Sequence, residues 1–213
     1  MERKTVLYAS TVAALAAFVC AIVMGFGVPV PGPGVSLQPS VPPVPLSEFV
    51  RPTNEYPELA LRFFAADSLF VLSYLMVFVG LYTVAADRSR VFAGVGLGAG
   101  VLAALLDVTE NAFFITYARL ALNAVPLEQP ALPLIYVLAN LKWMAAFAAL
   151  YAFGLVWPRN SWLGRIISGL MLIFPLVGVL GVANPNMIAW RGLFFLIGML
   201  LFAWYFWRQA RKA

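Results

Sequence analysis

Long apolar runs, separated by short polar segments, fill most of the 213-residue chain. Each run is close to or above the roughly 20 residues that an α-helix needs to cross a hydrocarbon core of about 30 Å. The pattern predicts an all-α integral membrane protein, a bundle of six transmembrane helices. The predicted spans cover approximately residues 6–27, 60–85, 92–121, 132–156, 164–183 and 187–207.

Three of these runs have features of their own. The first, VLYASTVAALAAFVCAIVMGFG, exceeds the apolar core of a signal peptide and no clear small-residue cleavage site follows it, so we interpret it as a retained membrane helix. The third is long enough to be tilted or to extend beyond the bilayer. The fifth contains Pro175, which removes a backbone donor and should kink the helix.

One connection is long. Residues 28–58 are predicted to form an external loop that holds nine of the fifteen prolines. Repeated proline favours polyproline II geometry, so the first half of this loop should be stiff and poor in helix. The loop can be interpreted as a rigid spacer or as a lid over an external cavity. No soluble domain is apparent, and residues 1–213 are interpreted as a single membrane domain.

Composition and charge agree with a membrane protein. Only 11% of the residues are charged and the mean hydropathy is +0.90, whereas soluble domains carry about 25% charged residues. Nine Lys and Arg residues fall on the side of the two termini and four on the other side. The positive-inside rule therefore predicts that both termini are cytoplasmic. We expect the protein to reside in the cell membrane.

Several functions are excluded or disfavoured by what the chain lacks. Without histidine, it offers no imidazole ligand for haem or zinc and no histidine base. A single cysteine, Cys20, excludes an intramolecular disulfide. The basic residues lie at helix ends and do not form one surface, and no phosphate-binding loop is present. We therefore expect no cofactor, no metal site and no nucleic-acid partner.

The segment LLDVTENAFF, residues 105–114, places polar groups inside the third apolar run. On a helix, Asp107, Glu110 and Asn111 lie within an arc of about 100°. The same face carries small residues, which allow close helix packing, and should point into the bundle. These small residues are Gly96, Gly100, Ala103 and Ala104.

Counting along the spans predicts where the polar groups meet. Lys142 and Glu110 each lie about ten residues, or roughly 15 Å, from the external end of their spans, with Asp107 deeper, near the bilayer centre. Asp67 and Arg191 lie nearer the external surface. Because all are at the midplane or in the outer half, the sequence predicts an external-side polar cavity. Its ligand-binding residues would be Asp67, Asp107, Glu110, Asn111, Lys142 and Arg191.

Aromatic side chains share a helix face with two of these residues. Such a face can line a small-molecule site or serve as helix packing. Asp67 shares its face with Phe63, Phe64, Phe70, Tyr74 and Phe78, and Arg191 with Phe194, Phe195, Gly198, Phe202 and Tyr205.

The buried charges allow a structural interpretation as well. A charge at the centre of a bilayer costs about 2.5–3.5 kcal/mol on insertion scales and is expected to be paired. A Glu110–Lys142 pair, with Arg191 pairing to Asp67 or Asp107, would clamp helices together. Three carboxylates against two cations would still leave one acid for a proton or a ligand.

Three functions follow as alternatives. The first is binding, and as an extension transport, of a small amphiphilic or charged molecule. The second is an accessory or assembly subunit of a larger membrane complex, in which the charges are clamps. The third is an intramembrane acid–base enzyme acting on a lipid, for which no catalytic residue is assigned.

The first run also carries an unbroken stripe of small residues, which offers a close-packing surface for another helix or for a partner membrane protein. The stripe consists of Ala9, Ala13, Ala17 and Ala21. With this stripe, its number of spans, its topology, its length and its long first external loop, the chain resembles the substrate-binding subunits of energy-coupling-factor vitamin transporters. The resemblance is architectural and implies no particular binding residues. Membrane lipids and a small-molecule ligand are the other expected partners.

Overall fold

The computed structural model describes residues 2–27, 37, 47–125, 132–184 and 187–213, and helices are the regular elements in these ranges. They are α1 (Arg3–Ile22) with a π-helical turn η1 (Val23–Gly27), α2 (Ser47–Glu55), α3 (Pro57–Ala85), α4 (Arg90–Leu122), α5 (Leu132–Val156), α6 (Trp162–Ala183) and α7 (Ile188–Ala210).

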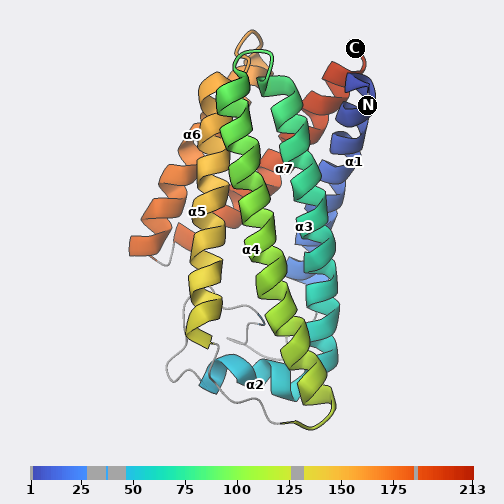
Figure 1. Ribbon diagram of the computed structural model, residues 1–213, viewed down its shortest axis with the longest axis vertical. Helices are drawn as coiled ribbons and strands as arrows, with labels where there is room; N and C mark the ends of the chain where they lie inside the picture. Colours follow the sequence, from blue (N-terminus) through green and yellow to red (C-terminus); the bar gives the residue numbers. More distant parts are fainter. Residues whose placement is uncertain (1, 28–36, 38–46, 126–131, 185–186) are drawn as a thin grey trace.

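Six of the helices, all except α2, are long and apolar enough to cross a membrane. The predicted helical membrane bundle with six spans is confirmed to that extent. The two termini lie at one end of the bundle, called here the N/C end, and α2 lies across the opposite end, called the α2 end (Figure 1). Which end faces the cytoplasm remains a prediction from the positive-inside rule.

The second half of the predicted loop, residues 28–58, contains a helix, because α2 occupies Ser47–Glu55, and α3 already begins at Pro57. Helix α2 is short and contains Pro52, so its periodicity is hard to recognise. It buries Val50 and Thr53 while Asn54 and Glu55 stay exposed. The proline-rich first half of the predicted loop lies outside the described residues, apart from the buried Leu37.

Local signals start the long helices. Pro57 occupies the first turn of α3, where its missing N–H is not needed, and Glu58 follows at the positive end of the helix dipole. Ser89 caps α4 by accepting a hydrogen bond from the Phe92 amide, and Ser161 caps α6 in the same way. Helix α6 continues through Pro175 to Ala183.

The six long helices form a closed ring. Neighbouring helices pack in the order α1, α3, α4, α5, α6, α7, and α7 returns to α1. Helices α3 and α5 lie on either side of α4 and touch each other only lightly. At the N/C end the interior is filled by the main hydrophobic core, which includes Leu81, Phe153 and Phe206, each fully buried.

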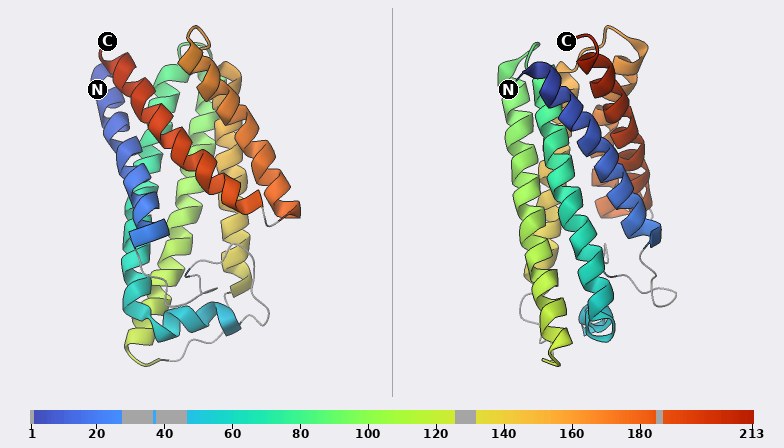
Figure 2. Two further views of the ribbon diagram at one scale, coloured as in Figure 1. Left: turned by 180° about the vertical axis from the view of Figure 1, so that it is seen from behind. Right: turned by 90° about the vertical axis from the view of Figure 1, so that its right-hand side faces the viewer.

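The helices of the ring differ in length. Helix α4 has 33 residues, about 50 Å at 1.5 Å per residue, whereas α7 has 23, about 35 Å. Helices α3, α4 and α5 therefore extend toward the α2 end past the ends of α1, α6 and α7 (Figure 2). A second hydrophobic cluster lies in this extension, beneath α2. It consists of Leu37, Val50, Ala60, Phe64, Phe114, Ala118 and Ile135.

Helix α1 uses part of its alanine stripe inside the ring. Ala17 is completely buried, Ala13 and Ala21 are half-buried, and only Ala9 is exposed. Helices α3 and α7 are the elements that cover α1. A partner protein at the stripe stays a prediction.

Candidate binding site

The centre of the site is an ion triad, formed by Lys142 of α5 with Asp107 and Glu110 of α4. The Lys142 Nζ lies 2.7 Å from Asp107 Oδ1 and 2.6 Å from Glu110 Oε2. The side chains are 12%, 5% and 1% exposed, respectively, so water screens these contacts little. The triad contains the predicted Glu110–Lys142 pair. Because one ammonium contacts both carboxylates, the carboxylates of Asp107 and Glu110 lie at the same depth in the bundle.

Tyr74 links a third helix to the triad. Its hydroxyl donates a hydrogen bond of 2.9 Å to Asp107 Oδ2. Asp107 is thus held by Tyr74 from α3 and by Lys142 from α5, and each of its oxygens has a donor. The side chains of α3, α4 and α5 are in this way joined by charge-assisted hydrogen bonds at one point.

Asp67 and Asn111 form the remaining polar part of the cluster. Asp67 is 5% exposed and Asn111 is 2% exposed. Asp67 Oδ2 and both side-chain polar atoms of Asn111 have no hydrogen-bond partner, although the Asn111 amide lies beside Asp67. Among the described residues no Lys or Arg forms an ion pair with Asp67. Asp67 is therefore a buried carboxylate without a counter-ion in this part of the chain.

The predicted pairing of Arg191 with Asp67 or Asp107 is wrong. The Arg191 guanidinium lies over the ring of Trp143, with its central carbon 4.3 Å from the ring centroid. The face of an indole attracts a cation, and this contact replaces a carboxylate partner. Trp143 directly follows Lys142 in the sequence, so the ring that binds Arg191 projects from α5 beside the ion triad.

A cavity of about 410 Å³ occupies the interior of the ring. Its polar lining groups are Asp67, Tyr74, Asp107 and Lys142, and the other lining residues are apolar or glycine, apart from the Trp143 indole. Of the six predicted site residues, the cavity is lined by Asp67, Asp107 and Lys142. Glu110 and Asn111 lie behind them, in contact with the polar cluster, and Arg191 lies behind Trp143.

Aromatic side chains of α3 and α7 form the walls of this cavity. Phe70 of α3 and Phe195 of α7 contact each other in this wall, with ring centroids 5.0 Å apart. Two residues that the sequence placed on these walls lie elsewhere: Phe64 stacks on Phe114 in the second hydrophobic cluster, and Tyr205 packs on Trp157. The others do line the cavity, namely Phe63, Phe70, Tyr74, Phe78, Phe194, Phe195, Gly198 and Phe202.

The polar cluster lies near the end of the shorter helices. Phe195 and Arg191 belong to the beginning of α7, and they contact Phe70 and Trp143, which are close in sequence to Asp67 and Lys142. The cavity also reaches Met24 and Gly25 of η1, directly after α1. The polar end of the cavity is therefore toward the α2 end, and the apolar part continues toward the N/C end.

Sequence reasoning missed several cavity residues. The sequence placed Tyr74 on an aromatic face, but the hydrogen bond from its hydroxyl to Asp107 depends on how α3 packs on α4. Trp143 was signalled only by its position next to Lys142. Leu170 and Phe174 of α6 had no signal, because α6 carries no buried charge that marks its inward face.

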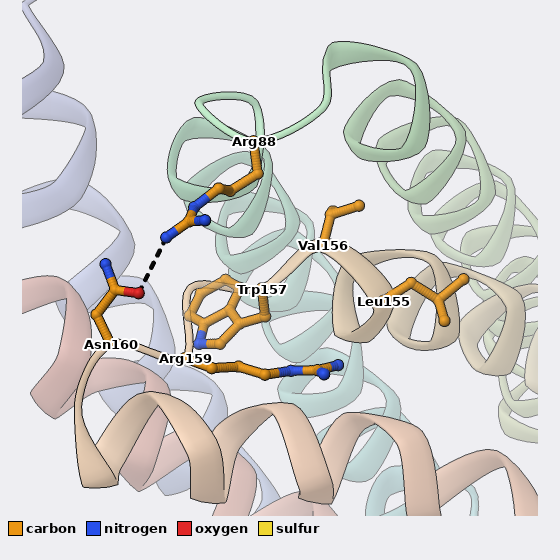
Figure 3. Close-up of a pocket in the computed structure, with 6 residues that line it drawn as sticks. All are labelled: Arg88, Leu155, Val156, Trp157, Arg159 and Asn160. Carbon is orange, nitrogen blue, oxygen red and sulfur yellow. Dashed lines mark hydrogen bonds between the residues drawn. The ribbon is translucent and has the colours of Figure 1, made fainter.

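A smaller cavity of about 290 Å³ lies at the N/C end, between the turn after α3 and the turn after α5 (Figure 3). Arg88 donates a hydrogen bond of 3.0 Å to Asn160, which ties the two turns together. Arg159 donates to Ser168 of α6 and to the Gly154 carbonyl of α5, at 2.9 and 3.1 Å. These bonds fasten helix ends to each other, and we interpret this region as a structural joint.

Comparisons with protein-family models, with curated proteins and with solved structures found no match. The architectural resemblance to transporter subunits stays a prediction. Within the described ranges, no group of three or more Cys, Asp or Glu side chains is arranged to hold a metal ion.

Proposed function

We propose that this protein binds a small amphiphilic molecule in the cavity at the centre of the helix ring. The observation that carries the proposal is the composition of that cavity, which is apolar and aromatic over most of its surface and polar at one end. Its volume of about 410 Å³ falls in the usual range of small-molecule sites, roughly 300–1,000 Å³.

The ligand is oriented by this asymmetry. Its apolar body lies against the aromatic side chains of α3 and α7 that line the cavity, among them Phe70 and Phe195. Its polar end lies against Asp67, Asp107 and Lys142. With both termini in the cytoplasm, the polar end is on the external side, and the ligand enters near the ends of α1 and α7. These two helices are close at the N/C end and diverge toward their other ends (Figure 2).

Binding has more support than transport. Passage to the cytoplasm would need a route through the main hydrophobic core at the N/C end. There Val84, Ala85 and Phe206 are between 0% and 3% exposed, and the ends of the helices are tied together by Arg88 and Asn160. A transport cycle would have to open this core, whereas binding needs no rearrangement of it.

The ion triad supports the clamp interpretation for its own three residues. Lys142, Asp107 and Glu110 satisfy one another across α4 and α5 at distances below 3 Å. A clamp beside the cavity is compatible with binding, since it fixes the polar wall that the ligand meets.

The test fills the cavity without touching a charge. A side-chain carbon added at Gly198 would meet Leu170 at 3.4 Å and Phe202 at 3.7 Å, which are ordinary contacts, so Gly198→Leu extends into the cavity without a backbone clash. Gly98→Leu is the matched control, because a carbon added at Gly98 meets nothing within 4 Å and this position is exposed on α4.

The purified proteins in a neutral detergent are titrated with phenylbutanol, phenylbutylamine and phenylbutyrate, and the melting temperature is followed by tryptophan fluorescence. We expect at least one of these probes to stabilise the wild type and Gly98→Leu, and none to stabilise Gly198→Leu. The proposal is overturned if no probe stabilises the wild type, or if Gly198→Leu responds like the control.

A further inference from the structure

We infer that the ligand carries a protonated amine, which pairs with Asp67. The inference rests on the proposed function, because it concerns the polar group of the molecule bound in the same cavity. It starts from the one carboxylate in the cavity wall that has no cation beside it.

The other charged groups of the cavity wall, Asp107 and Lys142, already have ionic partners. Lys142 is shared by Asp107 and Glu110, and Asp107 also accepts a hydrogen bond from Tyr74. The hydrogen bonds of Tyr74 and Lys142 go to Asp107 and Glu110 and not to Asp67. With the carboxylates ionised, the triad carries a formal charge of −1, Asp67 adds −1, and Arg191 behind Trp143 adds +1. The polar end therefore keeps a net charge of −1, which attracts a cation and repels an anion.

A purely structural Asp67 would be expected to have its hydrogen bonds satisfied. Asn111, whose amide lies beside Asp67, could have provided them, yet neither Asn111 Nδ2 nor Asp67 Oδ2 meets the geometry of a hydrogen bond. Buried polar groups in proteins are nearly always paired, and an exception calls for an explanation. A charged amine entering the cavity would supply the missing cation and the missing donor together.

The surroundings of Asp67 also suit a cation. Phe63, Phe70 and Tyr74 lie on the same side of α3 and line the cavity with Asp67. Aromatic faces attract ammonium groups, and the attraction grows when the group is removed from water. Beyond these rings the cavity wall is apolar, with Leu150, Leu170 and Met199 among its residues. The implied ligand has one amine at the end of an apolar body.

The experiment compares three molecules that share one apolar body. Phenylbutylamine, phenylbutanol and phenylbutyrate differ only in a positive, neutral or negative end. Their dissociation constants are measured by calorimetry at neutral pH, in neutral detergent, for the wild type and Asp67→Asn. The matched control is Glu58→Gln, which removes a carboxylate from the exposed first turn of the same helix.

We expect the amine to bind the wild type and Glu58→Gln at least about tenfold more tightly than the alcohol, and phenylbutyrate to bind most weakly. In Asp67→Asn the preference for the amine should disappear while the affinity for the alcohol is unchanged. Because the substitution removes an unpaired buried carboxylate, Asp67→Asn should melt at the wild-type temperature or above, which confirms that it folds.

The outcomes separate the two proposals. If the alcohol binds the wild type but the amine has no advantage, or if Asp67→Asn keeps the preference, the amine inference is refuted and binding in the cavity stands. If neither the amine, the alcohol nor the butyrate binds the wild type, the proposed function fails as well.

Discussion

Removal of Lys142 from the ion triad should be among the most damaging single substitutions in this protein. In Lys142→Met, the carboxylates of Asp107 and Glu110 lose their common cation while they remain buried at 5% and 1% exposure. Breaking one side of a buried ion pair typically costs about 3–5 kcal/mol. For a chain of this size that corresponds to a fall in melting temperature of about 10 °C.

The structure also ranks the related substitutions. Glu110→Gln leaves Lys142 with Asp107 as a partner at 2.7 Å, so its cost should be well below that of Lys142→Met. The double substitution Glu110→Gln with Lys142→Met still leaves Asp107 ionised, supported only by Tyr74. Only the triple substitution, with Asp107→Asn added, removes every charge of the triad and should recover most of the lost stability.

Thermal unfolding in detergent, followed by tryptophan fluorescence, measures the series in parallel. The clamp argument predicts the order wild type, Glu110→Gln, double, Lys142→Met from most to least stable, with the triple near the wild type. If Lys142→Met melts at the wild-type temperature or higher, the triad does not hold α4 to α5. The charges of the triad would then serve the ligand, and the assignment of a structural role to the triad and a ligand-binding role to Asp67 would be wrong.

Other substitutions test separate parts of the structure. Tyr74→Phe loses a buried hydrogen bond of 2.9 Å to the ion triad and should cost about 1.5–3 kcal/mol, measured by the same unfolding assay; an unchanged melting temperature would contradict the bond. Gly100→Ala places a carbon 2.6 Å from an aromatic ring of α3 and should destabilise, whereas Gly98→Ala faces open space and should stabilise by up to about 1 kcal/mol through helix propensity; equal effects would refute the packing of α3 on α4. The guanidinium of Arg3 lowers the pKa of Asp87. A carboxyl group with a lowered pKa stabilises the fold above its unfolded pKa and loses that effect as the pH falls through its folded pKa. Arg3→Gln should therefore slightly reduce stability at pH 7, and by progressively less as the pH falls below about 4. Because both side chains are about half exposed, the effect should stay below about 1 kcal/mol, and a larger one would refute the surface assignment.

The spans and the inward face of α4 could be predicted because each depends on one helix at a time. Apolar length determines a span, and the 3.6-residue period places Asp107, Glu110 and Asn111 together. Both α4 and the fourth predicted span agree with the structure to within two residues. The Glu110–Lys142 pair could be predicted for a similar reason, since only the depths of two residues on adjacent helices had to be compared.

The partners of Arg191 and Tyr74 could not be predicted, because they depend on how helices from distant parts of the sequence pack. Arg191 contacts Trp143 and not a carboxylate because α7 packs beside α6 and faces that part of α5. The sequence also could not show which aromatic residues line the cavity and which only pack between helices. Phe63 lines the cavity and its neighbour Phe64 does not. A helix face is broad, and periodicity alone does not divide it between two neighbours.

The unequal lengths of the helices have a consequence for the surrounding bilayer. Exposed apolar side chains follow α4 from Val91 to Leu122, whereas on α7 they run only from Trp190 to Trp207. The protein therefore presents a greater hydrophobic thickness on its α4 side than on its α7 side. Lipids must stretch around one side, thin around the other, or let the bundle tilt, at a cost of fractions of a kcal/mol per Å of mismatch. Such a wedge-like perimeter would favour places where thick and thin membrane meet, and it makes the distribution of this protein in the membrane sensitive to lipid chain length.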